Sequence, residues 1–154
     1  MATIKYVRGD LFTTDCKVLM QCISADFGMG AGIAVEFTRR YKVMQFLKQG
    51  AWLNSNNLIK TVWPSCFPVI DEETGTMILN LVTKEKYSDK PTINSLENAL
   101  IHASYYIGQR GIYEIALPKI GSGLDRLPWK EVEDCLLYCL PKAPNVELTV
   151  YHLD

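Results

Sequence analysis

The sequence has few of the residues from which metal and nucleophilic sites are usually built. It contains only two histidines, His102 and His152, and no Cys-x-x-Cys pair. No zinc-ligand spacing can be assembled from these residues. The histidines also lie far from the glycine-rich stretches described below, so neither a Ser–His nor a Cys–His nucleophile is expected.

Long apolar runs and a signal-peptide pattern are absent as well. We therefore expect an intracellular protein, cytoplasmic with a nuclear location as the alternative, and no membrane partner. The cysteine count is odd, which favours free thiols in a reducing compartment. The five cysteines are Cys16, Cys22, Cys66, Cys135 and Cys139.

The sequence also lacks an excess of charge of either sign. Sixteen basic and 17 acidic side chains leave a net charge of −1, which gives no reason to expect broad binding to nucleic acid or membrane. A chain of 154 residues, 48% hydrophobic and 21% charged, is typical of a globular protein. We expect one domain over residues 1–154.

Short apolar runs alternate with segments of helical periodicity, which predicts an α/β fold with a mixed β-sheet flanked by helices. The strands are predicted at residues 3–7, 18–23, 58–63, 66–69, 76–82, 112–117 and 146–152, and the helices at 33–48, 92–107 and 129–140. Residues 66–69 and 76–82 form a hairpin in this prediction. The first helix is expected to point Val35, Phe37, Tyr41, Met44 and Leu47 inward. The second is expected to begin at an N-cap, Thr92, and to bury Leu96, Ala99, Leu100, Ala103 and Ile107.

Three glycines at two-residue spacing, Gly28, Gly30 and Gly32, separate a predicted buried strand from a helix. A glycine-rich loop in that position is the usual geometry for binding a diphosphate at a helix N-terminus. The spacing is not Gly-x-Gly-x-x-Gly, and no Gly-x-x-x-x-Gly-Lys-Ser/Thr motif occurs. An NAD-binding Rossmann domain and a P-loop nucleotidase are therefore set aside.

A second glycine turn, Gly121-Ser122-Gly123, joins another predicted strand to a helix. Its backbone N–H groups could form an anion-binding concavity, although a plain helix-capping turn would have the same sequence. Asp125 follows two residues later. A carboxylate there weakens phosphate binding unless it has a task, such as acid–base work or holding a hydroxyl.

Ligands of open α/β sheets bind at the carboxyl ends of the strands. Asp10, residues 24–32, Lys84 and residues 121–125 all fall there in the predicted arrangement. Asp10 could accept a hydrogen bond from an exocyclic amine such as that of adenine, and Lys84 could meet Asp125 at the far end of the ligand. Asp10 could equally be a turn residue, and Lys84 a solvated loop lysine. The residues alone predict a protein that binds a diphosphate-containing nucleotide.

Several segments resemble the macrodomain family, and in detail its terminal ADP-ribose protein glycohydrolase branch. They occur in family order over nearly the whole chain and together form a specific pattern. They are Tyr6-Val7-Arg8-Gly9-Asp10-Leu11-Phe12, Cys22-Ile23-Ser24, Met29-Gly30-Ala31-Gly32-Ile33-Ala34-Val35, Thr83-Lys84, Lys90-Pro91-Thr92, and Ile120-Gly121-Ser122-Gly123-Leu124-Asp125-Arg126-Leu127.

The resemblance implies a three-layer macrodomain-like fold and binding of ADP-ribose. Separately, we expect a monomer. Asp10 would hold the adenine, the two glycine loops would hold the diphosphate and the distal ribose, and Ser24 would lie near the ribose. The implied ligand-binding residues are Asp10, Leu11, Ser24, Gly30, Ala31, Gly32, Ile33, Ala34, Ile120, Gly121, Ser122, Gly123 and Leu124.

The residues that match the catalytic pair of this branch are Lys84 and Asp125. The resemblance implies that the lysine attacks the anomeric carbon of the distal ribose and that the aspartate acts as general acid–base. The implied substrates are ADP-ribose linked as an ester to Glu or Asp side chains and O-acyl-ADP-ribose. A nucleophilic lysine must lose its proton, whereas a neighbouring carboxylate favours the charged form. A carboxylate leaving group needs no strong acid, so no metal or redox cofactor is required.

Three alternatives stay open: a non-catalytic ADP-ribose reader, an ADP-ribose 1″-phosphate phosphatase, and a hydrolase of ADP-ribosylated nucleic-acid bases. The chain also departs from the family pattern. It lacks the Asn-x-x-Asn segment that many deacetylase-type macrodomains carry before the first glycine loop, and residues 50–75 match poorly. Acceptor contacts therefore cannot be carried over to residues 50–75.

Overall fold

The computed structural model describes residues 2–28, 32–45, 63–122, 125–140 and 145–153. Strands and helices alternate along the chain, with a β-hairpin in the middle. The elements are β1 (Thr3–Arg8), η1 (Leu11–Thr13), β2 (Val18–Ser24), α1 (Ile33–Arg40), β3 (Ser65–Asp71), β4 (Thr76–Lys84), α3 (Ile93–Arg110), β5 (Glu114–Pro118), α4 (Trp129–Cys139) and β6 (Glu147–His152).

The six strands form one mixed sheet in the order β1-β6-β5-β2-β4-β3. All neighbouring pairs run parallel except the β3–β4 hairpin, which is antiparallel. The predicted α/β class and the hairpin are both confirmed. Because β1, β2, β4, β5 and β6 all point the same way, their carboxyl ends share one edge of the sheet.

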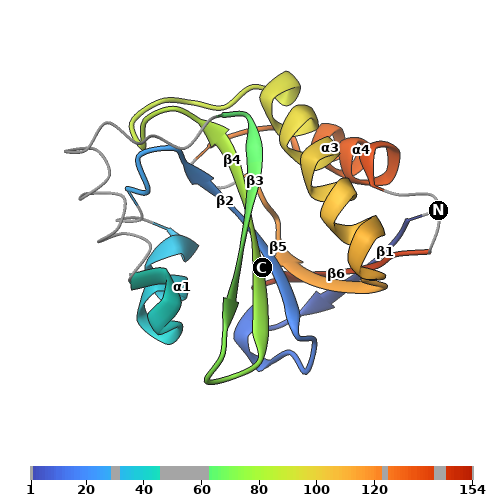
Figure 1. The fold of residues 1–154 in the computed structure, drawn as a ribbon. Coiled ribbons are helices and arrows are strands. Elements are labelled where there is room, and N and C mark those ends of the chain that lie inside the picture. The colour runs from blue at the N-terminus through green and yellow to red at the C-terminus, as the bar shows by residue number, and fades with distance from the viewer. Residues whose placement is uncertain (1, 29–31, 46–62, 123–124, 141–144, 154) are drawn as a thin grey trace.

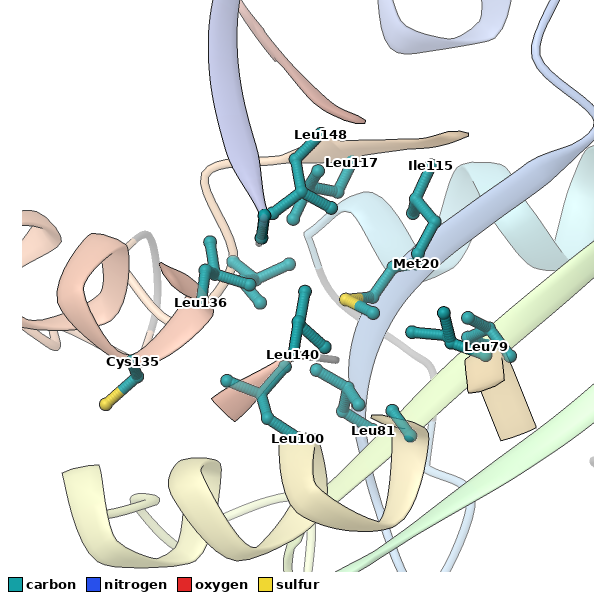
Figure 2. Close-up of a cluster of buried hydrophobic side chains, with 14 of the residues drawn as sticks. Met20, Leu79, Leu81, Leu100, Ile115, Leu117, Cys135, Leu136, Leu140 and Leu148 are labelled. Atoms are coloured by element: carbon teal, nitrogen blue, oxygen red, sulfur yellow. The ribbon is translucent and has the colours of Figure 1, made fainter. Parts of the chain in front are cut away.

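Helices lie on both faces of this sheet (Figure 1). On one face, α3 and α4 cover the larger core, which contains Leu100 and Leu136 from the helices and Met20, Leu81 and Ile115 from the strands (Figure 2). On the other face, α1 and η1 enclose a smaller core. This second core includes Leu11, Leu19, Ile23, Phe27, Phe37, Met44, Ile78, Val82 and Ala116.

Helix α3 begins as predicted. The Thr92 hydroxyl accepts a hydrogen bond from the Ser95 N–H, and the Ser95 hydroxyl accepts one from the Thr92 N–H, each at 3.0 Å. This reciprocal cap fixes the helix start. The predicted buried residues of α3, from Leu96 to Ile107, all lie in the larger core.

The prediction for the first helix is wrong in its length. Helix α1 ends at Arg40, because Tyr41 has an extended backbone with φ −120° and ψ 110°, and residues 42–45 form a further helical turn. Phe37 is buried as predicted, and so is Met44 in the turn after α1, but Val35 is 42% exposed, so its predicted inward position is wrong. Leu47 lies outside the described residues.

The predicted strand at residues 58–63 also lies outside the described residues, apart from Trp63, which is in a bend before β3. The five cysteines are free thiols, as predicted. No helix in the described part of the chain is both long enough and apolar enough to cross a membrane.

Candidate functional site

The shared carboxyl edge of the parallel strands brings the predicted site segments together. Asp10 follows β1, Ser24 ends β2, Lys84 ends β4, and Ile120 follows β5. Strand β2 lies between β4 and β5 in the sheet. The two glycine loops therefore emerge from neighbouring strands, as a ligand clamped between them would require.

Asp10 is held by its own turn. It is the N-cap of η1, and its Oδ1 accepts a hydrogen bond from the Phe12 N–H at 3.0 Å. Within the described residues Oδ2 has no recorded partner, so this oxygen can accept from a ligand. Leu11 is only 3% exposed and packs in the smaller core, so its side chain does not face a ligand.

The first glycine loop ends at Gly32, the N-cap of α1, with φ 63° and ψ −151°. Only glycine adopts this combination without severe strain. Ile33 and Ala34 form the first turn of α1, where backbone N–H groups lack partners within the helix. Gly30 and Ala31 lie outside the described residues.

The second glycine loop closes on itself. Gly121 has φ 74°, and its carbonyl accepts a hydrogen bond from the Leu127 N–H at 2.6 Å. A Cβ at Gly121 would lie 3.0 Å from Leu127 Cδ1, so a side chain there would displace Leu127 in addition to the strain of the positive φ. Ile120 is buried, and the Ser122 hydroxyl donates to the Lys119 carbonyl at 2.9 Å. Gly123 and Leu124 lie outside the described residues.

Lys84 and Asp125 meet. Lys84 Nζ lies 2.9 Å from Asp125 Oδ1, although the residues are 41 positions apart in sequence. The two side chains are 15% and 14% exposed. They form an enclosed ion pair at the end of two neighbouring loops, with a basic nitrogen and a carboxylate in position to exchange a proton.

Comparisons with known proteins place the chain in a family, although no family model matches it. The chain is 35% identical over 153 residues to the human ADP-ribose glycohydrolase OARD1, a match that covers 97% of this chain and 91% of the relative. Its structure matches the macrodomain of Mycobacterium tuberculosis DarG with a TM-score of 0.83, 25% identity and 98% coverage of both chains. The chain belongs to the macrodomain family.

A second group of relatives of this macrodomain consists of bacterial proteins named DNA ADP-ribosyl glycohydrolase. The one from Mycobacterium tuberculosis is 28% identical over 153 residues. Those residues cover 96% of this chain but only 42% of the relative. The fold resemblance predicted from the sequence motifs is therefore confirmed by both sequence and structure.

A β-bulge in β4 sets the direction of the Lys84 side chain in this macrodomain. Ile23 of β2 lies opposite Val82 of β4, whereas the next residue, Ser24, lies opposite Lys84. Thr83 is the extra residue in this change of register. If the side chains of β4 alternated strictly between the two faces of the sheet, Lys84 would lie on the same face as Val82, the face that α1 covers. The bulge instead gives it the position opposite Ser24, on the side of α4 and Asp125.

Cys22 lies beside the ion pair on β2. Burial raises the pKa of the Cys22 thiol, the Asp125 carboxylate raises it further, and Lys84 opposes this only in part. The thiol is therefore protonated at neutral pH and is a poor nucleophile. No group of metal-binding side chains is found in the parts of the chain that the structure describes.

Both loops carry a non-glycine residue with a left-handed backbone. Phe27 has φ 54° just before the first glycine loop, and Arg126 has φ 59° directly after Asp125. Such conformations cost free energy and cluster at functional sites. Phe27 is buried and packs edge to face on Phe67, with ring centroids 5.7 Å apart, so it belongs to the core rather than to a ligand surface.

Proposed function

We propose that this macrodomain binds ADP-ribose and hydrolyses the ester bond that joins it to Glu or Asp side chains. The observation that supports this most is the enclosed Lys84–Asp125 pair at the ends of the two glycine loops. A protein that only bound ADP-ribose would need Asp10 and the loops but would have no use for a buried ion pair. The human relative named ADP-ribose glycohydrolase supports the same assignment.

In the proposed reaction, substrate binding displaces water from the pair and the Lys84 amine gives its proton to Asp125. The neutral amine attacks C1″ of the distal ribose. A C1″–N bond forms, the C1″–O bond breaks, and the acceptor carboxylate leaves with the bonding electrons. Because a carboxylate is a stable anion, its departure needs no strong acid.

Water completes the proposed reaction. Asp125 returns its proton to the nitrogen as the C1″–N bond breaks, and then accepts a proton from the attacking water. The products are ADP-ribose, a free carboxylate on the acceptor and one proton. The same steps would deacylate O-acyl-ADP-ribose when the acyl group is on the reacting oxygen, so we propose this second activity at the same site.

The test is incubation with a protein that carries glutamate-linked mono-ADP-ribose, with released ADP-ribose measured by mass spectrometry. Release of free ADP-ribose together with an intact acceptor is the expected result. Measurable ADP-ribose binding without release from any acceptor would instead leave a reader. Release of inorganic phosphate from ADP-ribose 1″-phosphate alone would support the phosphatase alternative, for which a Lodderomyces elongisporus relative is 27% identical over 167 residues.

A nucleic-acid acceptor is the second candidate. It is favoured by the relatives named DNA ADP-ribosyl glycohydrolase, because that name specifies DNA. The same assay with ADP-ribosylated thymidine DNA tests it. Release from DNA but not from protein would keep the proposed pocket and change the acceptor class.

A further inference from the structure

Asp26 joins the start of the first glycine loop to the loop that follows Lys84. Its Oδ1 accepts hydrogen bonds from the Ser24 hydroxyl at 2.5 Å and from the Gly28 N–H at 3.0 Å. Its Oδ2 accepts one from the Tyr87 N–H at 3.2 Å, across 61 residues of sequence. One carboxylate thus connects the start of the first glycine loop to the segment after Lys84.

The backbone continues this connection beyond the ends of the strands. The Ala25 N–H donates to the Lys84 carbonyl at 2.9 Å, and the Asp26 N–H donates to the Glu85 carbonyl at 3.2 Å. The backbone of Lys84 is therefore restrained by two hydrogen bonds, one to its own carbonyl and one to the carbonyl of Glu85, the next residue. Because Thr83 bulges out of the ladder immediately before Lys84, these later bonds fix where the lysine stands.

The Tyr87 side chain takes part in the same contact, because it packs against Gly28. A Cβ on Gly28 would lie 2.9 Å from Tyr87 Cβ and 3.1 Å from Tyr87 Cδ1, so the tyrosine lies directly against the glycine backbone. The glycine is required because the two segments approach so closely. We call the contact among Asp26, Gly28 and Tyr87 the loop clasp.

We propose that Asp26 is a positioning residue that sets the distance between the Lys84 amine and the distal ribose through the loop clasp. The glycine loop would hold the diphosphate and so place the ribose, while the clasp places Lys84 relative to that same loop. This inference rests on the proposed function, because it assumes that the lysine attacks C1″. A misplacement of about 1 Å costs on the order of 100-fold in rate, which makes such a restraint valuable.

Asp26→Asn is the informative variant. Its Oδ1 can still accept from Ser24 and Gly28, but its NH₂ group would face the Tyr87 N–H, donor against donor. Only the side-chain hydrogen bond from Asp26 to Tyr87 is lost, while the backbone bonds between the two segments remain. We expect turnover to fall about 10-fold to 100-fold, while the Kd for ADP-ribose changes less than about 3-fold. Asp26→Ala should reduce both, because the glycine loop also loses its hydrogen bond.

The matched control is Asp89→Asn. Asp89 lies in the same loop as Tyr87, and its carboxylate accepts from the Lys86 N–H at 3.0 Å. Among the described residues, no hydrogen bond joins the Asp89 side chain to the first glycine loop. Its turnover should equal that of the wild type. Gly28→Ala disturbs the clasp from the opposite side, because the new methyl group displaces Tyr87. It should lower turnover in the same way as Asp26→Asn.

A second measurement uses free ADP-ribose, so it does not depend on knowing which acceptor the protein acts on. Free ADP-ribose presents an aldehyde at C1″ in its open-chain form. An amine condenses with it, with loss of water, and cyanoborohydride supplies the hydride that reduces the imine to a stable secondary amine. Peptide mapping by mass spectrometry then measures how much ADP-ribose is attached to Lys84, and Asp26→Asn should reduce this by the same factor as turnover.

The outcomes separate the two proposals. A wild-type protein that traps ADP-ribose on Lys84 but releases none from either acceptor contradicts the proposed substrates, and the trapping comparison still tests Asp26. If the wild type neither traps nor releases, both proposals fail. Turnover and trapping in Asp26→Asn equal to the wild type, or a loss of ADP-ribose affinity as large as the loss of turnover, would overturn the role of Asp26. Melting temperatures of all variants exclude loss of folded protein as the cause.

Discussion

The two ends of the candidate site are built in different ways. At one end, the Asp10 carboxylate is fixed within its own turn, by the N–H two residues along the chain. At the other end, Lys84 depends on Asp125, 41 residues away. The first arrangement is local and the second is tertiary. We therefore expect substitutions to separate the two ends, with binding losses at the Asp10 end and rate losses at the Lys84 end.

The largest effect is expected for Lys84→Ala. Loss of the nucleophile should lower kcat by about 1,000-fold or more, while the Kd for ADP-ribose stays within a few-fold, because the adenine and diphosphate contacts are untouched. Steady-state kinetics with an ester-linked substrate and calorimetry with ADP-ribose measure the two quantities. Lys86→Ala, two residues along the same loop, is the control and should retain full activity. Equal activity of both variants would remove Lys84 from the mechanism.

Asp125→Asn should come next, with kcat lower by about 100-fold to 10,000-fold, the usual contribution of a general acid–base group. The amide keeps the size of the side chain but cannot take a proton from the amine or from water. A variant with normal turnover would show that the carboxylate only holds Lys84 in place.

Gly32→Ala tests the first glycine loop, midway between the two ends. Any side chain at φ 63° and ψ −151° is strained by about 1–3 kcal/mol, so both thermal stability and ADP-ribose affinity should fall. Gly108→Ala is the matched control, because Gly108 lies in α3 with nothing within 4 Å of a new Cβ. That substitution should stabilise the protein by about 0.5–1 kcal/mol and leave binding unchanged.

A smaller effect is expected for Asp10→Asn, the test of the local end. Asparagine caps a helix as well as aspartate does, so η1 should stay intact. Its NH₂ group would replace the oxygen proposed to accept from adenine, which should weaken ADP-ribose binding about 10-fold, or about 1.4 kcal/mol. The kcat at saturating substrate should be nearly unchanged. A fall in kcat without a change in affinity would contradict the division of the site into two ends.

The smallest effect is expected from thiol modification. Burial raises the pKa of Cys66 to about 12 and that of Cys139 to about 11, and the pKa values of Cys16, Cys22 and Cys135 are raised as well. At pH 7.5 all five thiols are therefore protonated and react slowly. Treatment of the native protein with iodoacetamide should leave turnover unchanged, whereas rapid inactivation would implicate a cysteine.

Sequence patterns predicted most of what short-range physics controls. The hairpin, the Thr92 cap and the buried face of α3 each depend on residues within a few positions of one another. The break after Arg40 was missed because the apolar spacing continues through Phe37, Tyr41 and Met44 on both sides of it. Periodicity reports which residues are apolar, not whether the backbone between them stays helical.

In the site, local patterns marked the loops but not their connections. Glycine spacing and strand ends pointed to Asp10, Gly32 and Gly121 and suggested that Lys84 meets Asp125, and the family resemblance implied the catalytic roles of that pair. Nothing in the sequence indicated that Asp26 would contact Tyr87, because the pair depends on how β2 lies beside β4. The bulge at Thr83 was likewise invisible, since it changes the register of the strands and not the order of residue types.

That bulge has an evolutionary consequence. If β4 ran straight through Thr83, Lys84 would turn toward α1, while Asp10 and both glycine loops would stay as they are. On the proposed function, such a protein would still hold ADP-ribose but could no longer release it from an acceptor. A shift of one residue in strand register would then separate a hydrolase of ADP-ribosylated acceptors from a protein that only binds ADP-ribose, although the residues that recognise ADP-ribose would be the same in both.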